Sequence, residues 1–511
     1  MTYSPLSTVS LIILIIGLSL GTFIQILDTS IANVAVPSIA GDLGVSPQEG
    51  TWVITSFAVS NAIILPLTGW LSNRFGGLRL FIWSTILFSL TSFLCGIAAT
   101  FPLLVVARVL QGAVAGALIP LSQGLLLIHF PEERKGLALG CWATVVVVAP
   151  VLGPVLGGWI TDDYGWPWIF YINIPIGVFS AFLTWSILKG RDNSLVKTPI
   201  DVIGLCFLVI GVASFQIFLD KGQELDWLNS DFIITLMALA LVFLTLFIVW
   251  SLYTEHPVVE FSFFKDRNFR ISTVLSALIY LVFFGTTVLV PLWLQTQQGY
   301  TPFMAGMAVM PIGLIPIVLS PVLGQLLGQL SLRLLSALSF SIFAYTSFWM
   351  SNFTTDVSLE EIMIIRFIQG LGVTFFFLPM LTLALSNIEK KSISSASGVY
   401  NFIRLVIGGG AGTALYVTFW SRREILHHSQ LGEAVNPFRQ VTQQAYGVME
   451  SLQIHGQTLT QFVDDLVTNQ ASMLAFDDLL WLSGWLSLLV IPFLFLCKEP
   501  QPSTNHIHAV E

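Results

Sequence analysis

Residues 102–129 read PLLVVARVLQGAVAGALIPLSQGLLLIH. Arg108 is the only Asp, Glu, Lys or Arg residue in this stretch. A helix that crosses a bilayer needs about 20 mostly apolar residues in a row, and this stretch is long enough. It therefore predicts a membrane-spanning helix, and an arginine inside such a helix requires a polar partner or a cavity.

The middle of this stretch recurs later in the chain. RVLQG at residues 108–112 is matched by RFIQG at residues 366–370, 258 residues further on. A weaker match between residues 69–79 and 324–333 has an offset of 254 residues. Chance similarity of short apolar motifs is the alternative, but two nearly equal offsets favour a duplicated half. The offset fits a half of six spans followed by two extra spans.

The composition of the whole chain indicates a membrane protein. Of the 511 residues, 55% are hydrophobic and only 10% are charged, whereas soluble domains carry about 25% charged residues. The net charge of −8 argues against nucleic acid as a partner. The four cysteines lie far apart in apolar runs, so neither a disulfide framework nor a metal site is expected.

Fourteen segments are long and apolar enough to be spans, so the sequence predicts an all-α membrane protein. With a cytoplasmic N-terminus, 14 of the 21 Lys and Arg residues fall in cytoplasmic segments and 4 in outside segments. This asymmetry predicts that both termini are cytoplasmic. The predicted spans are 11–36, 50–72, 79–100, 102–129, 137–161, 167–188, 199–219, 231–253, 269–293, 303–327, 332–350, 359–386, 396–420 and 479–498.

These spans divide the chain into parts. Residues 1–190 and 266–498 are predicted to form two six-helix halves, with two extra helices within 191–265 between them and a cytoplasmic tail at 499–511. The one long polar stretch, 421–478, is predicted to be a periplasmic loop. The short remaining connections leave little room for a soluble catalytic domain. Since no phosphate-binding P-loop motif occurs, an ion gradient is the expected energy source and no cofactor is expected.

Asp28 is the only carboxylate predicted well inside a span. Thr22, Gln25, Thr29 and Asn33 lie on the same side of that helix, within an arc of roughly 140° at 100° per residue. An acid in the bilayer must face a cavity or a partner, or be protonated, which suits reversible proton binding. We therefore expect this polar face to line a central cavity. A structural, hydrogen-bonded Asp is the alternative.

Three arginines fall inside spans. Gln111 lies one turn after Arg108, and this pair recurs around Arg366. The alternative for Arg108 is that it satisfies backbone carbonyls or extends its charge to the membrane surface. Arg366 is the counterpart of Arg108 in the repeat, and we interpret it first as a structural residue. Arg404 is assigned only to a cavity or an interface.

The predicted span 137–161 carries small residues at a helical spacing. Gly153 and Gly157 are four residues apart, a pattern that lets helices pack backbone to backbone. Pro150 and Pro154 remove backbone donors and kink the helix. A kinked, closely packed helix can act as a moving seal. Ordinary tight packing without a role in transport is the alternative.

Five motifs together resemble the major facilitator superfamily, in its fourteen-span drug–proton antiporter subfamily. They are LDTSIANVAVP at 27–37, GWLSNRFG at 69–76, RVLQG at 108–112, GPVLGG at 153–158 and WPWIFYINIP at 166–175. Three further segments resemble the EmrB type within that subfamily: LDKG at 219–222, PLWLQTQ at 291–297 and NFIR at 401–404. The resemblance covers almost the whole chain.

The resemblance implies the major facilitator fold, with two six-helix halves plus two extra central helices, and adds roles to the residues already singled out. Asn73 departs from the family's loop motif, which usually has an acid there. The predicted sites are proton coupling by Asp28 and Arg108; a substrate cavity with Gln25, Thr29, Asn33, Gln111 and Arg404; an antiporter motif of Pro150, Gly153, Pro154, Gly157 and Gly158; and a cytoplasmic loop motif of Gly69, Arg74, Gly76 and Arg79.

The implied function is proton-coupled export of small hydrophobic drugs across a bacterial inner membrane. The implied partners are a periplasmic membrane-fusion adaptor of EmrA type and an outer-membrane channel of TolC type. A siderophore or metabolite exporter on the same scaffold is the first alternative. A membrane-embedded enzyme acting on lipid-linked substrates is a second, and the single deep acid and short loops count against it. A receptor or scaffold would not need charges inside the membrane.

The polar stretch 421–478 has two interpretations, a docking site for the adaptor or a cap over the external mouth. Its histidines are weak candidates for a metal site. Apolar residues at helix-like spacing predict one face of a short amphipathic helix: Leu452, Leu459, Phe462, Val463 and Leu466.

Overall fold

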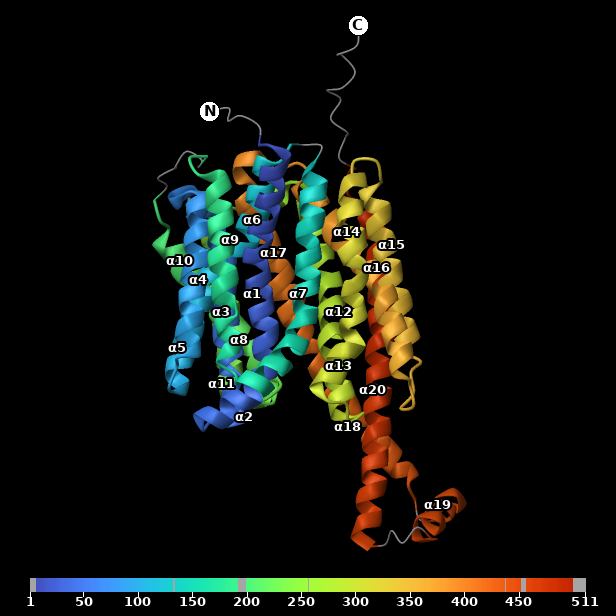
Figure 1. Cartoon of the computed structure of the whole chain (residues 1–511). Coiled ribbons are helices and arrows are strands. Elements are labelled where there is room, and N and C mark those ends of the chain that lie inside the picture. The colour runs from blue at the N-terminus through green and yellow to red at the C-terminus, as the bar shows by residue number, and fades with distance from the viewer. Residues whose placement is uncertain are drawn as a thin grey trace.

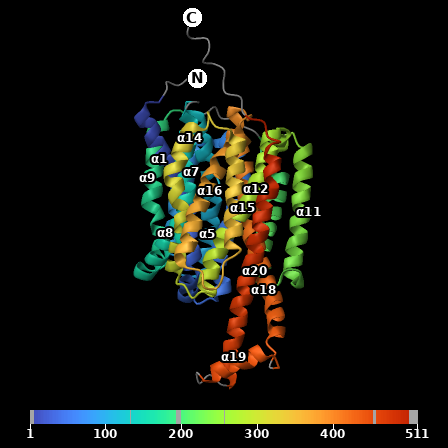
Figure 2. The ribbon, with the colours of Figure 1, turned by 90° about the vertical axis from the view of Figure 1, so that its right-hand side faces the viewer.

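The computed structural model describes residues 6–131, 134–191, 199–255, 257–436, 438–451 and 456–499. Within these ranges every regular element is a helix, which confirms the predicted all-α architecture. The long helices stand side by side in one bundle (Figure 1). The first turn of α1 and the last turn of α20 lie at the same end of the bundle, which we call the inner end (Figures 1 and 2).

The elements follow one another in three groups. The first half contains α1 (Thr8–Leu43), α2 (Pro47–Gly50), α3 (Trp52–Phe75), α4 (Gly77–Gly96), α5 (Phe101–Ala115), α6 (Leu118–His129), α7 (Lys135–Tyr164), α8 (Trp168–Tyr171) and α9 (Asn173–Leu188). The extra pair is α10 (Val202–Gly222) and α11 (Asp231–Tyr253), with η2 (Trp227–Asn229) between them and η3 (Phe261–Lys265) after them. The second half contains α12 (Arg267–Thr296), α13 (Pro302–Val309), η4 (Met310–Gly313), α14 (Leu314–Leu326), α15 (Leu332–Met350), α16 (Leu359–Leu385), η5 (Lys390–Ser392), α17 (Ile393–Phe402), η6 (Ile403–Gly410), α18 (Ala411–Ala434), α19 (Gln440–Ser451) and α20 (Gly456–Leu494).

Thirteen helical segments of the described chain are long and apolar enough to cross a membrane. α15 is not among them, although it covers the predicted span 332–350 with 19 residues and a single charged side chain, Arg333. Its serines and threonines lower its apolar content. It nevertheless lies in the bundle beside α16 and α20, so it occupies the place of the remaining predicted span.

Several predicted boundaries shift in the structure. α1 continues through Pro37 to Leu43 instead of ending at residue 36, since neighbouring helices support a proline in a bundle. The predicted spans 102–129, 303–327 and 396–420 each contain a break between two helices. The break in 396–420 is η6, a π-helix that includes three consecutive glycines. π-Helical turns interrupt regular helices mostly at functional positions.

Packing of the helices connects the two halves. In the first half, α1 packs against α7 and α9, and in the second half α12 packs against η6, α16 and α18. α7 also packs along α14, so it touches both α1 and the opposite half. α10 and α11 pack on each other and α10 on α3, which leaves α11 at the edge of the bundle (Figure 2).

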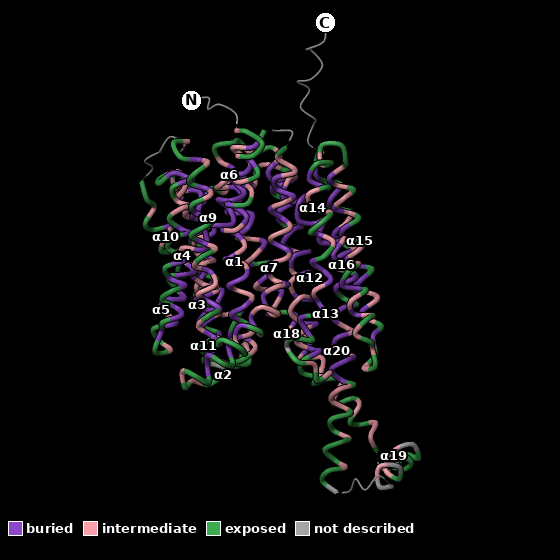
Figure 3. The backbone as a smooth tube through the Cα atoms, viewed as in Figure 1, coloured by how far each residue is buried: buried purple, intermediate pink, exposed green. Residues whose placement is uncertain are grey.

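The prediction of a long loop at 421–478 is wrong. α18 continues to Ala434, α19 follows, and α20 already begins at Gly456. Together they project beyond the bundle at the end opposite the inner end (Figures 1 and 3). We call α19 and the parts of α18 and α20 within residues 421–478 the outer extension. The polar sequence suggested a loop, but helices that lie in water do not need a continuous apolar stretch.

The predicted short amphipathic helix is the first part of α20, continuous with the last span. Leu459 and Val463 are half-buried, while Phe462 and Leu466 are exposed. Leu452 lies outside the described residues. The outer extension therefore presents some of its apolar side chains to its surroundings.

Candidate functional site

A buried ion pair lies inside the first half. Arg108 of α5 donates from Nη1 to Oδ2 of Asp28 in α1 across 2.5 Å. Almost none of either side chain is exposed: 0% for Arg108 and 1% for Asp28. Removing one member of a buried pair leaves an uncompensated charge, at a cost of roughly 3–5 kcal/mol. Each of the two residues therefore depends on the other.

Amide side chains complete the surroundings of the carboxylate. Gln111 and Asn173 both donate to Oδ1 of Asp28, at 3.0 and 2.7 Å. Gln111 also donates to Ser92 at 2.8 Å. The carboxylate accepts from three donors on two helices, α5 and α9, as a buried charge requires. The cluster thus ties α1, α4, α5 and α9 together.

Arg108 has further partners that do not depend on the charge of Asp28. Its Nε donates to the backbone oxygen of Val53 at 2.9 Å, and Nη1 also donates to Oε1 of Gln111 at 2.7 Å. Its Cζ lies 4.3 Å from the ring centroid of Phe57, a cation–π distance. These contacts can keep the guanidinium in place when the carboxylate is neutral.

The residues of the predicted polar face of α1 differ in their surroundings. Thr22 is buried and hydrogen-bonded to α6 and α7, and Asp28 is buried against α5 and α9. Gln25 is also buried, and Thr29 is half-buried with its hydroxyl donating to the backbone of Gln25 at 3.1 Å. Only Asn33 is exposed. An arc of roughly 140° is wide enough for its members to meet different neighbouring helices.

The small residues of α7 pack on α1. Ser30 of α1 donates to the backbone oxygen of Pro150 at 2.8 Å. A Cβ atom at Gly153 would lie 2.2 Å from Oγ of Ser30, and one at Gly157 would lie 3.2 Å from the backbone oxygen of Ile31. Both prolines of the motif, at 150 and 154, lie inside α7. The position of Gly158 differs, since a Cβ there would meet nothing within 4 Å.

α7 meets the second half just as closely, near the inner end. A Cβ at Gly136 would lie 2.0 Å from the backbone oxygen of Gly324 in α14, and one at Gly140 would lie 2.3 Å from that of Ser320. Contacts of this kind allow no side chain between the two backbones. α7 is therefore a direct mechanical link between α1 and the opposite half.

The inner end is closed by contacts between α3, α6 and α17. A Cβ at Gly69 would lie 2.0 Å from Oγ of Ser395. Asn401 donates to Oε1 of Gln123 at 2.8 Å, and Ser397 donates to the same oxygen. These contacts join the two halves, so the structure represents a state that is shut at the inner end.

The loop motif follows α3 at that same end. Gly76 caps α3 with φ +89°, a conformation that favours glycine and permits the abrupt turn into α4. Arg74 and Arg79 flank the turn and are both exposed. Gly69 has the packing contact with Ser395 described above. The motif therefore forms the turn between α3 and α4 and places two arginines at the inner end, near the contact between the two halves.

The second half contains two buried arginines without a carboxylate contact among the described residues. Arg366 donates to Oε1 of Gln369 at 2.5 Å and to the backbone oxygen of Thr286 at 2.9 Å. Arg404 in η6 donates to Oδ1 of Asn401 at 2.8 Å. The Cζ of Arg404 also lies 5.0 Å from the ring centroids of Tyr280 and Phe377 and 5.7 Å from that of Tyr400. Arg404 thus lies in an aromatic cage beside the contact between the halves.

Three residues of these polar contacts were not singled out from the sequence: Asn173, Ser92 and Gln123. Asn173 and Gln123 are amide side chains inside apolar helices, which is the same signal that identified Asp28. Ser92 carries no such signal, because serine is common in membrane helices.

The histidines of the outer extension pair with acids. His427 and His428 lie 2.7 and 3.1 Å from carboxylate oxygens of Asp478 and Asp464. Arg423 also binds Asp478, from Nε at 2.8 Å, which clamps α18 to α20. Across the described residues no group of three or more His, Cys, Asp or Glu could hold a metal ion.

Comparison with known proteins identifies relatives along nearly the whole chain. The sequence model of the Major Facilitator Superfamily matches residues 18–413. The multidrug export protein EmrB of Haemophilus influenzae is 43% identical over 501 residues, which is 98% of each chain. EmrB of Escherichia coli strain K12 is 43% identical over 97% of each chain.

Two further comparisons extend this finding. The fatty acid resistance protein FarB of Neisseria gonorrhoeae is 44% identical over 501 residues, again 98% of each chain. The crystal structure of the human organic anion transporter MFSD10 superposes with a TM-score of 0.56, at 10% identity, over 93% of this chain and 98% of the other. At that identity the likeness concerns the fold alone.

Proposed function

The chain belongs to the major facilitator superfamily, a family of membrane transporters and not of enzymes, and on this premise we propose that it exports amphipathic compounds in exchange for protons. The observation that carries the proposal is the buried pair of Asp28 and Arg108. Asp28 is the only buried carboxylate among the described residues. A group that binds a coupling proton needs such shielding, so that its charge changes only when the protein changes state.

The proposed coupling starts at Asp28. When Asp28 takes up a proton, its attraction to Arg108 is lost, while Arg108 keeps its contacts with Val53, Gln111 and Phe57. α1 is then less firmly bound to α5 and can shift. Deprotonation of Asp28 restores its ion pair with Arg108 and returns α1 to its original position.

The proposed route from α1 to the gate runs through α7. α1 contacts α7 at Ser30 and Ile31, and α7 contacts α14 at Gly136 and Gly140. Because no side chains separate these backbones, a shift of α1 moves α7 against the second half. The contacts at the inner end would then open, giving access to the space between the halves from the inner end. This two-state change is the alternating access expected of two rocking halves.

The cargo is proposed from the relatives. The EmrB proteins are named for multidrug export and FarB for fatty acid resistance, at nearly the same identity. Molecules of both kinds combine an apolar body with a polar group. We therefore place the cargo among amphipathic compounds, with fatty acids as a specific second candidate. The proposed location is a bacterial inner membrane, with the inner end in the cytoplasm.

The outer extension is proposed to dock a membrane-fusion adaptor of EmrA type, which would lead to an outer-membrane channel of TolC type. It projects beyond the bundle and exposes large apolar side chains, including Ile425 at 67% and Leu466 at 48% (Figure 3). Exposed apolar groups on a projecting helix pair suit a protein partner better than water. A cap over the outer mouth would instead fold back onto the bundle.

Transport is tested with purified protein in liposomes under an imposed pH gradient, using a fluorescent dye and a fatty acid as cargoes. Gradient-dependent movement of either cargo that stops when a protonophore is added supports the proposal. Movement that ignores the gradient contradicts proton coupling.

Docking is tested by replacing residues 430–470 with a short Gly/Ser linker. Liposome transport should persist, while resistance in cells and co-purification with the adaptor should be lost. Retention of both in cells would contradict docking, and failure of liposome transport would assign the extension to the transporter's own gate.

A further inference from the structure

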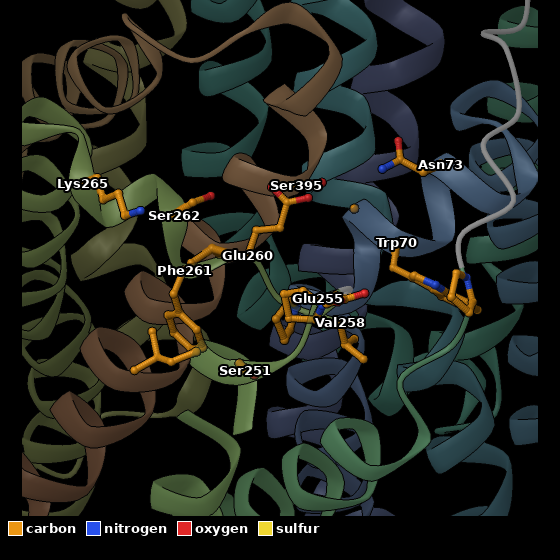
Figure 4. A pocket seen from close by; sticks show the side chains of 16 residues that line it. Trp70, Asn73, Ser251, Glu255, Val258, Glu260, Phe261, Ser262, Lys265 and Ser395 are labelled. Atoms are coloured by element: carbon orange, nitrogen blue, oxygen red, sulfur yellow. The ribbon is translucent and has the colours of Figure 1, made fainter. Parts of the chain in front are cut away.

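The inner end is shut where α17 of the second half meets α3 and α6 of the first half. Ser395 of α17 touches Gly69 there, and Figure 4 shows Ser395 on one side of this contact and Trp70 and Asn73 of α3 on the other. Gln123 of α6 also meets α17, with none of its surface exposed. A polar side chain buried between two halves of a protein must find its hydrogen bonds there.

Gln123 uses only one of its two polar atoms in this contact. Its Oε1 accepts from Nδ2 of Asn401 at 2.8 Å and from the hydroxyl of Ser397. Its Nε2 is buried and has no hydrogen-bond partner among the described residues. A buried N–H without a partner is unfavourable, so the orientation of this amide must be fixed by its neighbours. We call Gln123, Ser397 and Asn401 the inner latch.

Arg404 fixes the orientation of the Asn401 amide. Its Nη2 donates to Oδ1 of Asn401 at 2.8 Å. A guanidinium has donors and no acceptor, so it can bind only the oxygen of that amide. The nitrogen of the Asn401 amide then faces Gln123, and only the oxygen of Gln123 can accept from it. Arg404 therefore sets the direction of both hydrogen bonds in the chain from Arg404 through Asn401 to Gln123.

Arg404 is held in place by its own half of the molecule. Its Cζ lies 5.0 Å from the ring centroids of Tyr280 in α12 and Phe377 in α16, and 5.7 Å from that of Tyr400 in α17. A Cβ at Gly409 would lie 3.0 Å from the ring of Tyr280, so η6 runs close against α12. Cation–π contacts are strongest where water is excluded. The guanidinium can thus keep its position when the two halves separate.

We infer that Arg404 is a positioning residue of the inner gate: acting through Asn401, it orients and strengthens the hydrogen bond to Gln123 that holds the inner end shut. A charged donor strengthens the hydrogen bond that it makes and polarises the next one along the chain. When the inner end opens, Asn401 and Gln123 separate, while Arg404 stays among its rings. This role differs from the cargo contact expected from the sequence. It rests on the opening and closing of the proposed function, but not on its cargo or its proton.

The gate is measured by the distance between spin labels at Val9→Cys and Leu330→Cys, in the purified full-length chain without its four natural cysteines. Both positions are exposed and lie at the inner end of opposite halves, so opening should lengthen the distance. Arg404→Met should raise the ratio of long to short distances about threefold, because the charged donor is lost. Gln123→Met should raise this ratio about tenfold, because the contact between the halves is itself lost.

Three further variants separate positioning from a general structural effect. Arg404→Lys keeps a cationic side chain that only donates, so it should restore most of the parental ratio. In a chain that already carries Gln123→Met, Arg404→Met should cause no further change, since its connection to the gate is gone. Arg366→Met is the matched control and should leave the ratio unchanged, because the partners of this buried arginine, Gln369 and Thr286, lie in its own half.

An unchanged ratio in Arg404→Met would overturn the inference. A further increase when Arg404→Met is added to Gln123→Met would also overturn it, since Arg404 would then act by another route. The melting temperature of Arg404→Met should stay close to that of the parent, because methionine packs well among aromatic rings. A ratio that only follows the melting temperature across the variants would assign Arg404 to general stability and refute a role in the gate. The distances need neither cargo nor a pH gradient, so absence of liposome transport would refute the proposed function and leave the latch result standing.

Discussion

The two halves of the molecule carry the same arginine and glutamine in different surroundings. In the first half Arg108 binds the side chain of Asp28, and in the second half Arg366 binds the backbone oxygen of Thr286. In both cases the partner lies 80 residues earlier in the chain. Thr286 therefore occupies the position that Asp28 has in the first half.

The second half keeps the donors but lacks the acceptor. Gln111 donates to Asp28, whereas Nε2 of Gln369 and Nε of Arg366 have no hydrogen-bond partner among the described residues. The duplicated framework thus carries a carboxylate at this position in the first half only. If the proposed coupling holds, the first half is the coupling half, and we expect a structural role for the matching arginine of the second half.

The largest effect should come from Asp28→Asn. The substitution preserves shape and removes the proton-binding group, so gradient-driven efflux should fall by about tenfold or more. Dye efflux from liposomes measures this, and size-exclusion chromatography verifies folding. Asp231→Asn, at an exposed position in α11, is the control. Efflux at the parental rate in Asp28→Asn would exclude this residue as the coupling group.

Arg108→Ala and Arg366→Ala should differ in kind. Arg108→Ala should abolish active export, because Asp28 loses its ion-pair partner, and it should also lower stability by about 3–5 kcal/mol, because the carboxylate stays buried without that partner. Arg366→Ala should mainly reduce yield and thermal stability, by about 2–5 kcal/mol for truncation of a large buried side chain. Efflux per folded molecule and melting temperature separate the two outcomes. If both variants lost efflux equally while their stability stayed unchanged, the proposed difference between the two halves would be contradicted.

Gly157→Leu tests whether α7 passes the motion of α1 to the second half. A leucine cannot fit where a Cβ already lies 3.2 Å from the backbone of Ile31, so cycling should slow by about tenfold. Gly158→Leu is a neighbouring control, since a Cβ there meets nothing within 4 Å. Labelling of single cysteines on either side of the gate reports whether one state is frozen. Unchanged alternation in Gly157→Leu would remove the role of α7.

Thr286→Asp supplies the carboxylate that the second half lacks and so tests whether the two arginine sites are equivalent. The new carboxylate would face the unpaired amide of Gln369 and the guanidinium of Arg366, so the variant should fold with a melting temperature close to that of the parent. An isolated buried charge would instead cost several kcal/mol, about 3–5. Thr286→Asp combined with Arg366→Met is the control and should be poorly folded. Aggregation of the single variant would show that the two sites are not equivalent.

The smallest effect concerns the inner end of the second half. Partial burial opposes ionisation of Glu499, but hydrogen bonds from Ser331, from Arg333 and from two backbone N–H groups lower the pKa of this carboxyl. A lowered pKa adds stability above its ordinary value of about 4.5, and this gain is lost as the pH falls through the folded pKa. Glu499→Gln should therefore lower stability at pH 7 by at most about 1 kcal/mol, because the pair is partly exposed. The difference between variant and parent should shrink in melts at pH 4, and a constant difference would contradict the assignment.

The sequence was sufficient to predict the features that depend on residues close together in the chain. Apolar length located the helices, and a carboxylate and an arginine inside such stretches stood out at Asp28 and Arg108. The repeat also located Arg366. The polar residues 421–478 were misread as a loop, because hydropathy distinguishes lipid from water and does not distinguish helix from coil in water.

By itself, the sequence therefore determined an all-α membrane bundle with duplicated halves and a few charges inside it. Only the tertiary structure decided which groups meet: Asp28 with Arg108 and Asn173, and α7 with both α1 and α14. Helix formation depends on neighbours a few residues apart, so it can be read along the chain. Contacts between side chains 80 or 145 residues apart depend on how the helices rotate and pack, which local periodicity does not encode.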